Sequence, residues 1–202
     1  MKKLLYAILA IIIVLVVVGF IMGPKFYNQA IKLREDATSQ WANVESVYQR
    51  RADLIPNIVN TAKGYAEFEQ ETLTMVIEAR SKATSVTIDP SNITPQQLEQ
   101  FQNVQSGLSS ALARLLAVFE RYPDLKANEN FKELINELER TENRINVERN
   151  RFNESVNPYN VHLQSFPNNI LNLFIGKFDE MEYFKAEEGT ERAPEVNFDA
   201  NS

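Results

Sequence analysis

Charged and amide side chains gather in two short segments, "RRADLIPN" at residues 50–57 and "ERYPDLKAN" at residues 120–128. Neighbouring carboxylates can act as a general acid and base, or can bind a hard cation through oxygen. The chain has little that would organise such chemistry, because it contains no Cys and one His, His162. Metal sites in helical bundles use Glu-x-x-His pairs, and here Tyr159 stands three residues before His162. We therefore expect no catalytic residues, no metal site, no cofactor and no enzyme.

Each segment contains a proline that interrupts a helical pattern of apolar residues. The residue before a proline avoids the α region, so helices are expected to end near Ile55 and Tyr122. Apolar residues recur at spacings of three, four and seven over four stretches of similar length, at roughly 28–55, 57–84, 95–122 and 130–157.

These patterns predict an all-α fold in which an N-terminal transmembrane helix is followed by an up-and-down antiparallel four-helix bundle with long helices. Seven-residue repeats predict coiled-coil packing in part of the bundle. A single very long coiled coil is the alternative. The breaks at Pro56, at residues 85–94 and at Pro123 argue against it.

Single residues mark helix starts and the core. Thr94, with Pro95 and Gln97 after it, is typical of an N-cap. The last bundle helix should open at Asn128 or Asn130, and Pro158 should bend or end it. We also expect Trp41 in the core. On the apolar stripe of residues 95–122, the one polar residue is Gln105.

The N-terminus contains 20 consecutive residues without a charge, residues 4–23. At about 1.5 Å per residue, such a helix spans roughly 30 Å, the thickness of the bilayer core. A cleaved signal peptide is the alternative, but its apolar core is usually shorter and small-x-small residues follow it. We predict an uncleaved single-pass anchor. The adjacent Lys2 and Lys3 favour an N-inside orientation, with the helical domain outside the cytoplasm.

The predicted topology brings the two charged segments together at the membrane-distal end of the bundle, with Arg50 or Arg51 near Glu120 or Asp124. Helix ends carry unpaired N–H and C=O groups that charged side chains can satisfy, so an architectural role is the main interpretation. A partner-binding patch on the same end is the alternative, and catalysis there is the least favoured reading. The cluster comprises Arg50, Arg51, Asp53, Asn57, Glu120, Asp124, Lys126 and Asn128.

Residues 140–153 alternate charges along the last bundle helix. A solvated, salt-bridged face is the simpler interpretation. The alternative is a buried polar layer that fixes helix register, formed by Thr141, Arg144 and Asn153.

The segment after the bundle is rich in Leu, Ile and Phe and should end near the bilayer. It could lie at the membrane interface through Ile170, Leu171, Phe174 and Ile175, or pack across the base of the bundle, which we favour slightly. The expected division of the chain is therefore an anchor at 1–25, a bundle at 26–166, a short helical segment at 167–185 and a disordered tail at 186–202.

Several motifs together resemble the LemA family, among them "RRADLIPNIV", "ERYPDLKANENFKELINELERTENRINVERNRFNESVNPYN", "EYFKAEEG" and "APEVNF". The resemblance covers nearly the whole chain. It implies a bacterial single-pass membrane protein with an up-and-down helical bundle, and it implies no catalytic residues. An association of the family with a membrane protease suggests an accessory role.

The favoured function is a non-enzymatic interaction or scaffolding module of the bacterial envelope. Its expected partners are the lipid bilayer, a second copy of the chain or another envelope membrane protein. Nucleic acid is excluded, because 27 acidic residues against 21 basic ones give a net charge of −6. Membrane-surface remodelling and an accessory role for a membrane protease are the alternatives, and a carboxylate enzyme at the distal end is the least favoured.

Overall fold

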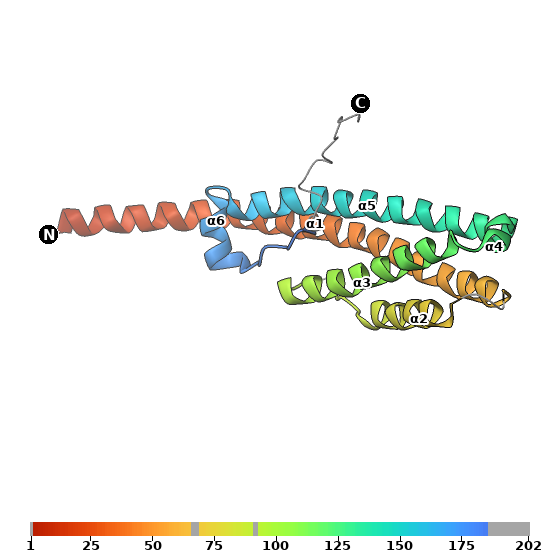
Figure 1. Cartoon of the computed structure of the whole chain (residues 1–202). Coiled ribbons are helices and arrows are strands. Elements are labelled where there is room, and N and C mark those ends of the chain that lie inside the picture. The colour runs from red at the N-terminus through yellow and green to blue at the C-terminus, as the bar shows by residue number, and fades with distance from the viewer. Residues whose placement is uncertain (1, 66–68, 91–92, 186–202) are drawn as a thin grey trace, which may run out of the picture.

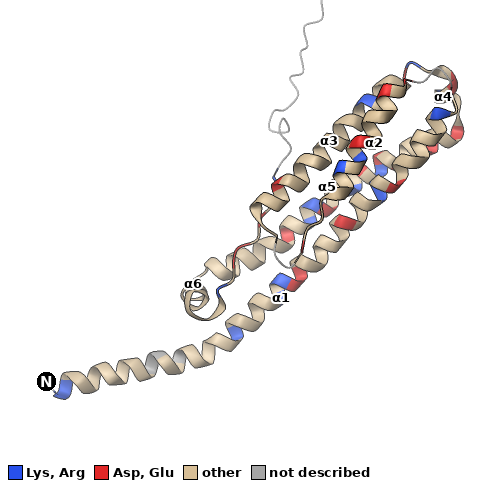
Figure 2. Cartoon of the chain, turned by 90° about the horizontal axis from the view of Figure 1, so that it is seen from below, with Lys and Arg blue, Asp and Glu red and all other residues tan. Residues whose placement is uncertain are grey.

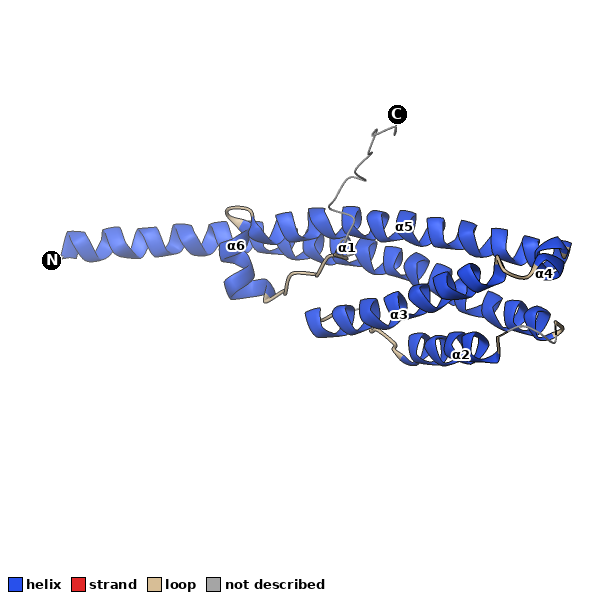
Figure 3. Ribbon diagram, viewed as in Figure 1, coloured by secondary structure: helices blue, strands red, loops and turns tan. Residues whose placement is uncertain are grey.

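The computed structural model describes residues 2–65, 69–90 and 93–185, with the side chains of 14, 15 and 18 left out (Figure 1). All regular structure in these residues is helical, which confirms the all-α class (Figure 3). The expected tail at 186–202 lies outside the described residues. The elements are α1 (Lys2–Lys63), α2 (Gln70–Ser85), α3 (Pro95–Phe119), α4 (Pro123–Ala127), α5 (Glu129–Gln164), α6 (Asn168–Leu171) and the π-helix η1 (Asn172–Gly176).

The long helices α1 and α5 lie side by side and run in opposite directions, with α2 and α3 packed along one half of the pair (Figure 1). We call the end of this assembly that carries α6 and η1 the base, because α1 enters there. The opposite end, which carries α4, is the far end. Two apolar cores follow one another along the assembly. The outer one includes Leu73, Leu115 and Phe131, and the inner one includes Trp41 and Phe152.

The four equal helices expected from the sequence are not those that form. The helices α1, α2, α3 and α5 contain 62, 16, 25 and 36 residues. The predicted end at Ile55 is wrong, because α1 continues through Pro56 to Lys63. Proline removes one helical N–H and leaves the carbonyl of Ala52 without its usual donor. The side chain of Arg80 on α2 donates to that carbonyl at 2.7 Å and replaces the missing bond.

The predicted helix starts are largely confirmed. Thr94 caps α3 in a complete capping box with Gln97. Asn128, rather than Asn130, caps α5, and its side chain accepts from the N–H of Phe131 at 3.0 Å. Pro123 begins α4 instead of ending α3, because proline suits the first turn of a helix. Pro158 lies inside α5, which continues to Gln164, so the expected end there is wrong.

Residues 177–185 form an extended segment, here called the strap, that covers the inner half of the α1–α5 pair. Met181 and Phe184 of the strap are buried in the inner core. Trp41, which is buried as expected, stacks on Phe184 with ring centroids 5.7 Å apart and an interplanar angle of 7°. The strap therefore supplies part of the covering that a fourth long helix would have provided.

The first turns of α1 project beyond the bundle and carry exposed apolar side chains, such as Leu5, Phe20 and Ile21. Charged residues are concentrated on the bundle helices (Figure 2). No helix within the described residues has the length and apolar character that crossing a membrane requires.

Candidate functional site

A buried arginine lies at the centre of a polar cluster between α1, α3 and α5. The side chain of Arg51 is 1% exposed and donates to three residues. Its Nη1 contacts Ser109 Oγ and Glu142 Oε2, each at 2.8 Å, and its Nη2 contacts Gln105 Oε1 at 2.6 Å. We call Arg51, Gln105, Ser109 and Glu142 the polar cluster.

The polar cluster connects α1, α2, α3 and α5. Gln105 passes a hydrogen bond on to the carbonyl of Ala83 on α2, at 3.2 Å. The guanidinium of Arg51 also lies over the ring of Tyr48, 5.2 Å from its centroid. A buried charge is tolerated only when its hydrogen-bonding groups are largely satisfied, so this arrangement fixes how the helices meet.

A cleft of about 600 Å³ opens next to the polar cluster. Its walls come from α1, α3, α5 and the end of the strap. Cations and carboxylates both line it, namely Arg51, Arg149, Lys185, Glu99, Glu142 and Glu182. The lining therefore carries both signs of charge.

The expected meeting of segments 50–57 and 120–128 at one end of the bundle is wrong. Arg50 pairs with Glu137 on α5, with its Nε 3.0 Å from the carboxylate, and Arg51 contacts the polar cluster. Because α1 continues to Lys63, Arg51 lies 12 residues, or about 18 Å, before the end of the helix.

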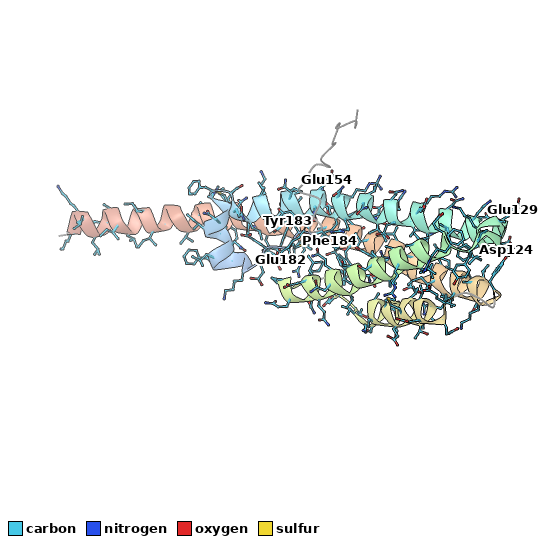
Figure 4. The ribbon with its side chains drawn as sticks, in the orientation of Figure 1. Asp124, Glu129, Glu154, Glu182, Tyr183 and Phe184 are labelled. Atoms are coloured by element: carbon cyan, nitrogen blue, oxygen red, sulfur yellow. The ribbon has the colours of Figure 1, made fainter. Side chains whose placement is uncertain are left out.

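Other members of the predicted distal cluster have local roles. Asp53 accepts from Gln49, one turn earlier, at 2.8 Å, and the exposed Asn57 offers its carbonyl to Thr61. Lys126 pairs with Glu120 at the far end, where Asp124 lies exposed in the first turn of α4 (Figure 4).

The far end is closed by contacts that the sequence reasoning missed. Arg121 pairs with Glu69 at 2.7 Å. The Nδ2 of Asn128 donates to the hydroxyl of Tyr65 at 2.9 Å. Both contacts join the connection between α1 and α2 to the part of the chain between α3 and α5, which is an architectural role.

Thr141, Arg144 and Asn153 do not form one polar layer. Thr141 is buried and donates to the carbonyl of Glu137 on its own helix. Arg144 pairs at 2.6 Å with Glu148, which is 2% exposed. Glu148 also accepts from Gln40 at 2.8 Å and from Arg151 at 3.0 Å, and the sequence reasoning did not single it out.

Asn153 belongs instead to a series of three asparagine clamps on the strap. In each clamp, the side-chain amide donates to the carbonyl of one strap residue and accepts from the N–H of the same residue. Asn172 holds Phe178, Asn160 holds Met181 and Asn153 holds Phe184, with all six distances between 2.8 and 3.0 Å. The seven-residue spacing of Asn153 and Asn160 was the available sequence signal.

Apolar side chains cover the outside of the base. Ile170, Phe174 and Ile175 are exposed, and so are Phe166 and Leu173, whereas Leu171 packs on the inner core. Ile175 also lies against α1, 3.0 Å from the place where a Cβ would stand on Gly23. The segment thus packs across the base, as favoured from the sequence, and presents an apolar outer face.

The fold and these contacts define an all-helical bundle protein whose buried polar groups join helices. The sequence model of the LemA family matches residues 40–198, and the chain belongs to this family. Magnetosome protein MamQ 2 of Paramagnetospirillum magneticum is 28% identical over 197 residues, covering 88% of this chain and 71% of that protein. Protein LemA of Metamycoplasma hominis is 24% identical over 139 residues, covering 69% of this chain and 60% of that protein.

Proposed function

We propose that this protein is a non-enzymatic scaffold of the bacterial envelope, attached to the membrane by residues 4–23 as a single-pass anchor. The main observation behind this proposal is that exposed apolar side chains are concentrated at one end of the molecule. The exposed residues Phe20 and Ile21 of α1 and Leu173 and Phe174 of η1 all lie at or before the base. An uncharged stretch of 20 residues is long enough, at roughly 30 Å, to enter the bilayer core.

The scaffold role is supported by how the polar residues are used. Arg51 and Glu148, both buried, make bonds between or along helices. These bonds stabilise a long rod that presents its far end to a second copy or to another envelope protein. Purification in mild detergent, with the particle mass measured by light scattering, tests this role. A strictly monomeric protein with no co-purifying partner would contradict it.

The side of the membrane can be determined with the Cys-free chain. Ser81→Cys places one thiol on the exposed surface of α2. An impermeant maleimide should label it in intact cells if the bundle lies outside the cytoplasm. Labelling only after the cells are opened would reverse the proposed orientation.

A second candidate role is contact with the lipid surface through the base. The main observation for this role is that the side chain of Phe174 is 74% exposed. In a Trp41→Phe background, Phe174→Trp in the full chain should be quenched by brominated lipids in vesicles. Ile77→Trp on α2 is the matched control, because Ile77 is exposed far from the base. Equal quenching of both variants would refute the lipid contact.

A further inference from the structure

The asparagine clamps follow a regular step along the strap. The clamped residues Phe178, Met181 and Phe184 are three positions apart, and their side chains are buried or half-buried against the inner core. The clamps on α5, Asn160 and Asn153, are seven positions apart. Three extended residues cover about 10 Å, and seven helical residues rise about 10.5 Å. The strap and α5 therefore keep the same register from one clamp to the next.

One further asparagine on α5 continues this series. Asn146 lies seven residues before Asn153 and is exposed. Seven helical residues return to the same face within about 20°. The strap still follows α5 at Lys185, whose carbonyl accepts from Arg149 at 2.7 Å, and Arg149 lies between Asn153 and Asn146.

We propose that Asn146 is a fourth clamp and that the cleft beside it is the docking site for the main chain of residues 186–188 of the same chain. The residue in register, three positions after Phe184, is Glu187. Asn146 would donate to its carbonyl and accept from its N–H, as the other clamps do.

The cleft has the chemistry and position to take this segment. Glu182, Tyr183 and Lys185 line it, so the described part of the strap ends at the cleft. Met181 and Phe184 are buried in the inner core, and the cations Arg51 and Arg149 line the cleft, with Arg149 also lying over the ring of Phe184. A glutamate at position 187 complements these cations. The family match also runs to residue 198, beyond the last described residue.

Amide hydrogen exchange in the full chain, in detergent micelles, tests the proposal residue by residue. The N–H of Glu187 should exchange about fivefold more slowly than the amides near Ser202, since one hydrogen bond of about 1 kcal/mol protects it. Asn146→Ala should abolish that protection. Asn143→Ala is the matched control, because Asn143 is also an exposed asparagine of α5 but lies outside the seven-residue series of Asn160, Asn153 and Asn146. Unprotected Glu187 in the unaltered chain, or equal protection in both variants, would overturn the proposal.

Two measurements show whether the tail of the same chain or that of a second copy occupies the cleft. A Glu-specific protease should cut after Glu187 and Glu188 more slowly than after Glu191 and Glu195, which serve as references in the same tail. Asn146→Ala should remove this difference, and an undiminished difference counts against the clamp. Protection that is independent of protein concentration supports docking within one chain. Protection that is lost on dilution would assign the cleft to the tail of a second copy and refute the proposal.

Discussion

Arg80 donates its Nε hydrogen to the carbonyl oxygen of Ala52 at 2.7 Å, across the contact between α2 and α1. Ala52 lies four residues before Pro56, so this oxygen is the one that the proline leaves without a helical donor. A side chain of α2 thus completes the hydrogen bonding of α1.

We expect Arg80→Met to lower the free energy of unfolding by about 1–3 kcal/mol, because a part-buried carbonyl loses its donor. In a Pro56→Ala background, the N–H of residue 56 can bond to the Ala52 carbonyl again. Arg80→Met should then lower the free energy of unfolding by a smaller amount. Denaturant titration of all four proteins measures this coupling. Lys82→Met, at an exposed position of α2, is the control, and equal losses in both backgrounds would show that Arg80 does not replace the missing bond.

Adjacent arginines on α1 should differ sharply in their effect on stability. Arg51→Met should cost about 2–4 kcal/mol of unfolding free energy, since Gln105, Ser109 and Glu142 all lose a charged donor. Arg50→Met should cost at most about 1 kcal/mol, because its side chain is 66% exposed in its pair with Glu137. Denaturant titration compares the two, and similar losses would contradict the central role of the polar cluster.

The single tryptophan reports on the strap. Asn153→Ala leaves the N–H and carbonyl of Phe184 without their clamp, and Phe184 stacks on Trp41. Loosening the strap should admit water to the indole and shift its emission to longer wavelengths. Asn150→Ala, at an exposed position of the same helix, should leave the spectrum unchanged. An unshifted spectrum in Asn153→Ala would mean that the core holds the strap without this clamp.

Stability should fall in alkaline solution because of Tyr159. Burial raises the pKa of its hydroxyl, nearby Arg34 lowers it, and Asp179 raises it further, with a net rise above the ordinary value of about 10. The unfolded chain then loses its proton first, so the contribution is complete below about pH 10 and is lost as pH rises through the folded pKa.

Tyr159→Phe should remove this part of the alkaline loss. It should also remove the hydrogen bond to the carbonyl of Asp179, which is 2.9 Å long. Denaturant titrations on both sides of pH 10 measure the difference from the unaltered chain. An identical pH dependence in both proteins would show that another group causes it.

Local features of this fold could be predicted because they depend on a few neighbouring residues. Thr94 and Gln97 form their capping box within four residues. Trp41 is buried because it lies on the apolar stripe of its helix. The sequence also showed that Gln105 is a polar residue on such a stripe, but it did not show which residue bonds to its side chain.

Long-range compensation could not be predicted from local patterns. Pro56 indicated a helix end because the donor that replaces its missing bond, Arg80, is 24 residues away in the chain. Because α1 continues to Lys63, Arg51 lies within the helix rather than next to a turn, and its side chain lies between α3 and α5. The strap could not be predicted because its clamps bind main-chain atoms. Every residue has these atoms, so the side chains of the strap give no sign of the clamps.

The unbroken course of α1 has a mechanical consequence. This helix runs from Lys2 to Lys63, about 93 Å at the usual rise. A twist of its first turns about the helix axis is carried as torque to Arg51, whose three partners lie on other helices. The same rod that holds the bundle at one end can therefore transmit rotation to it.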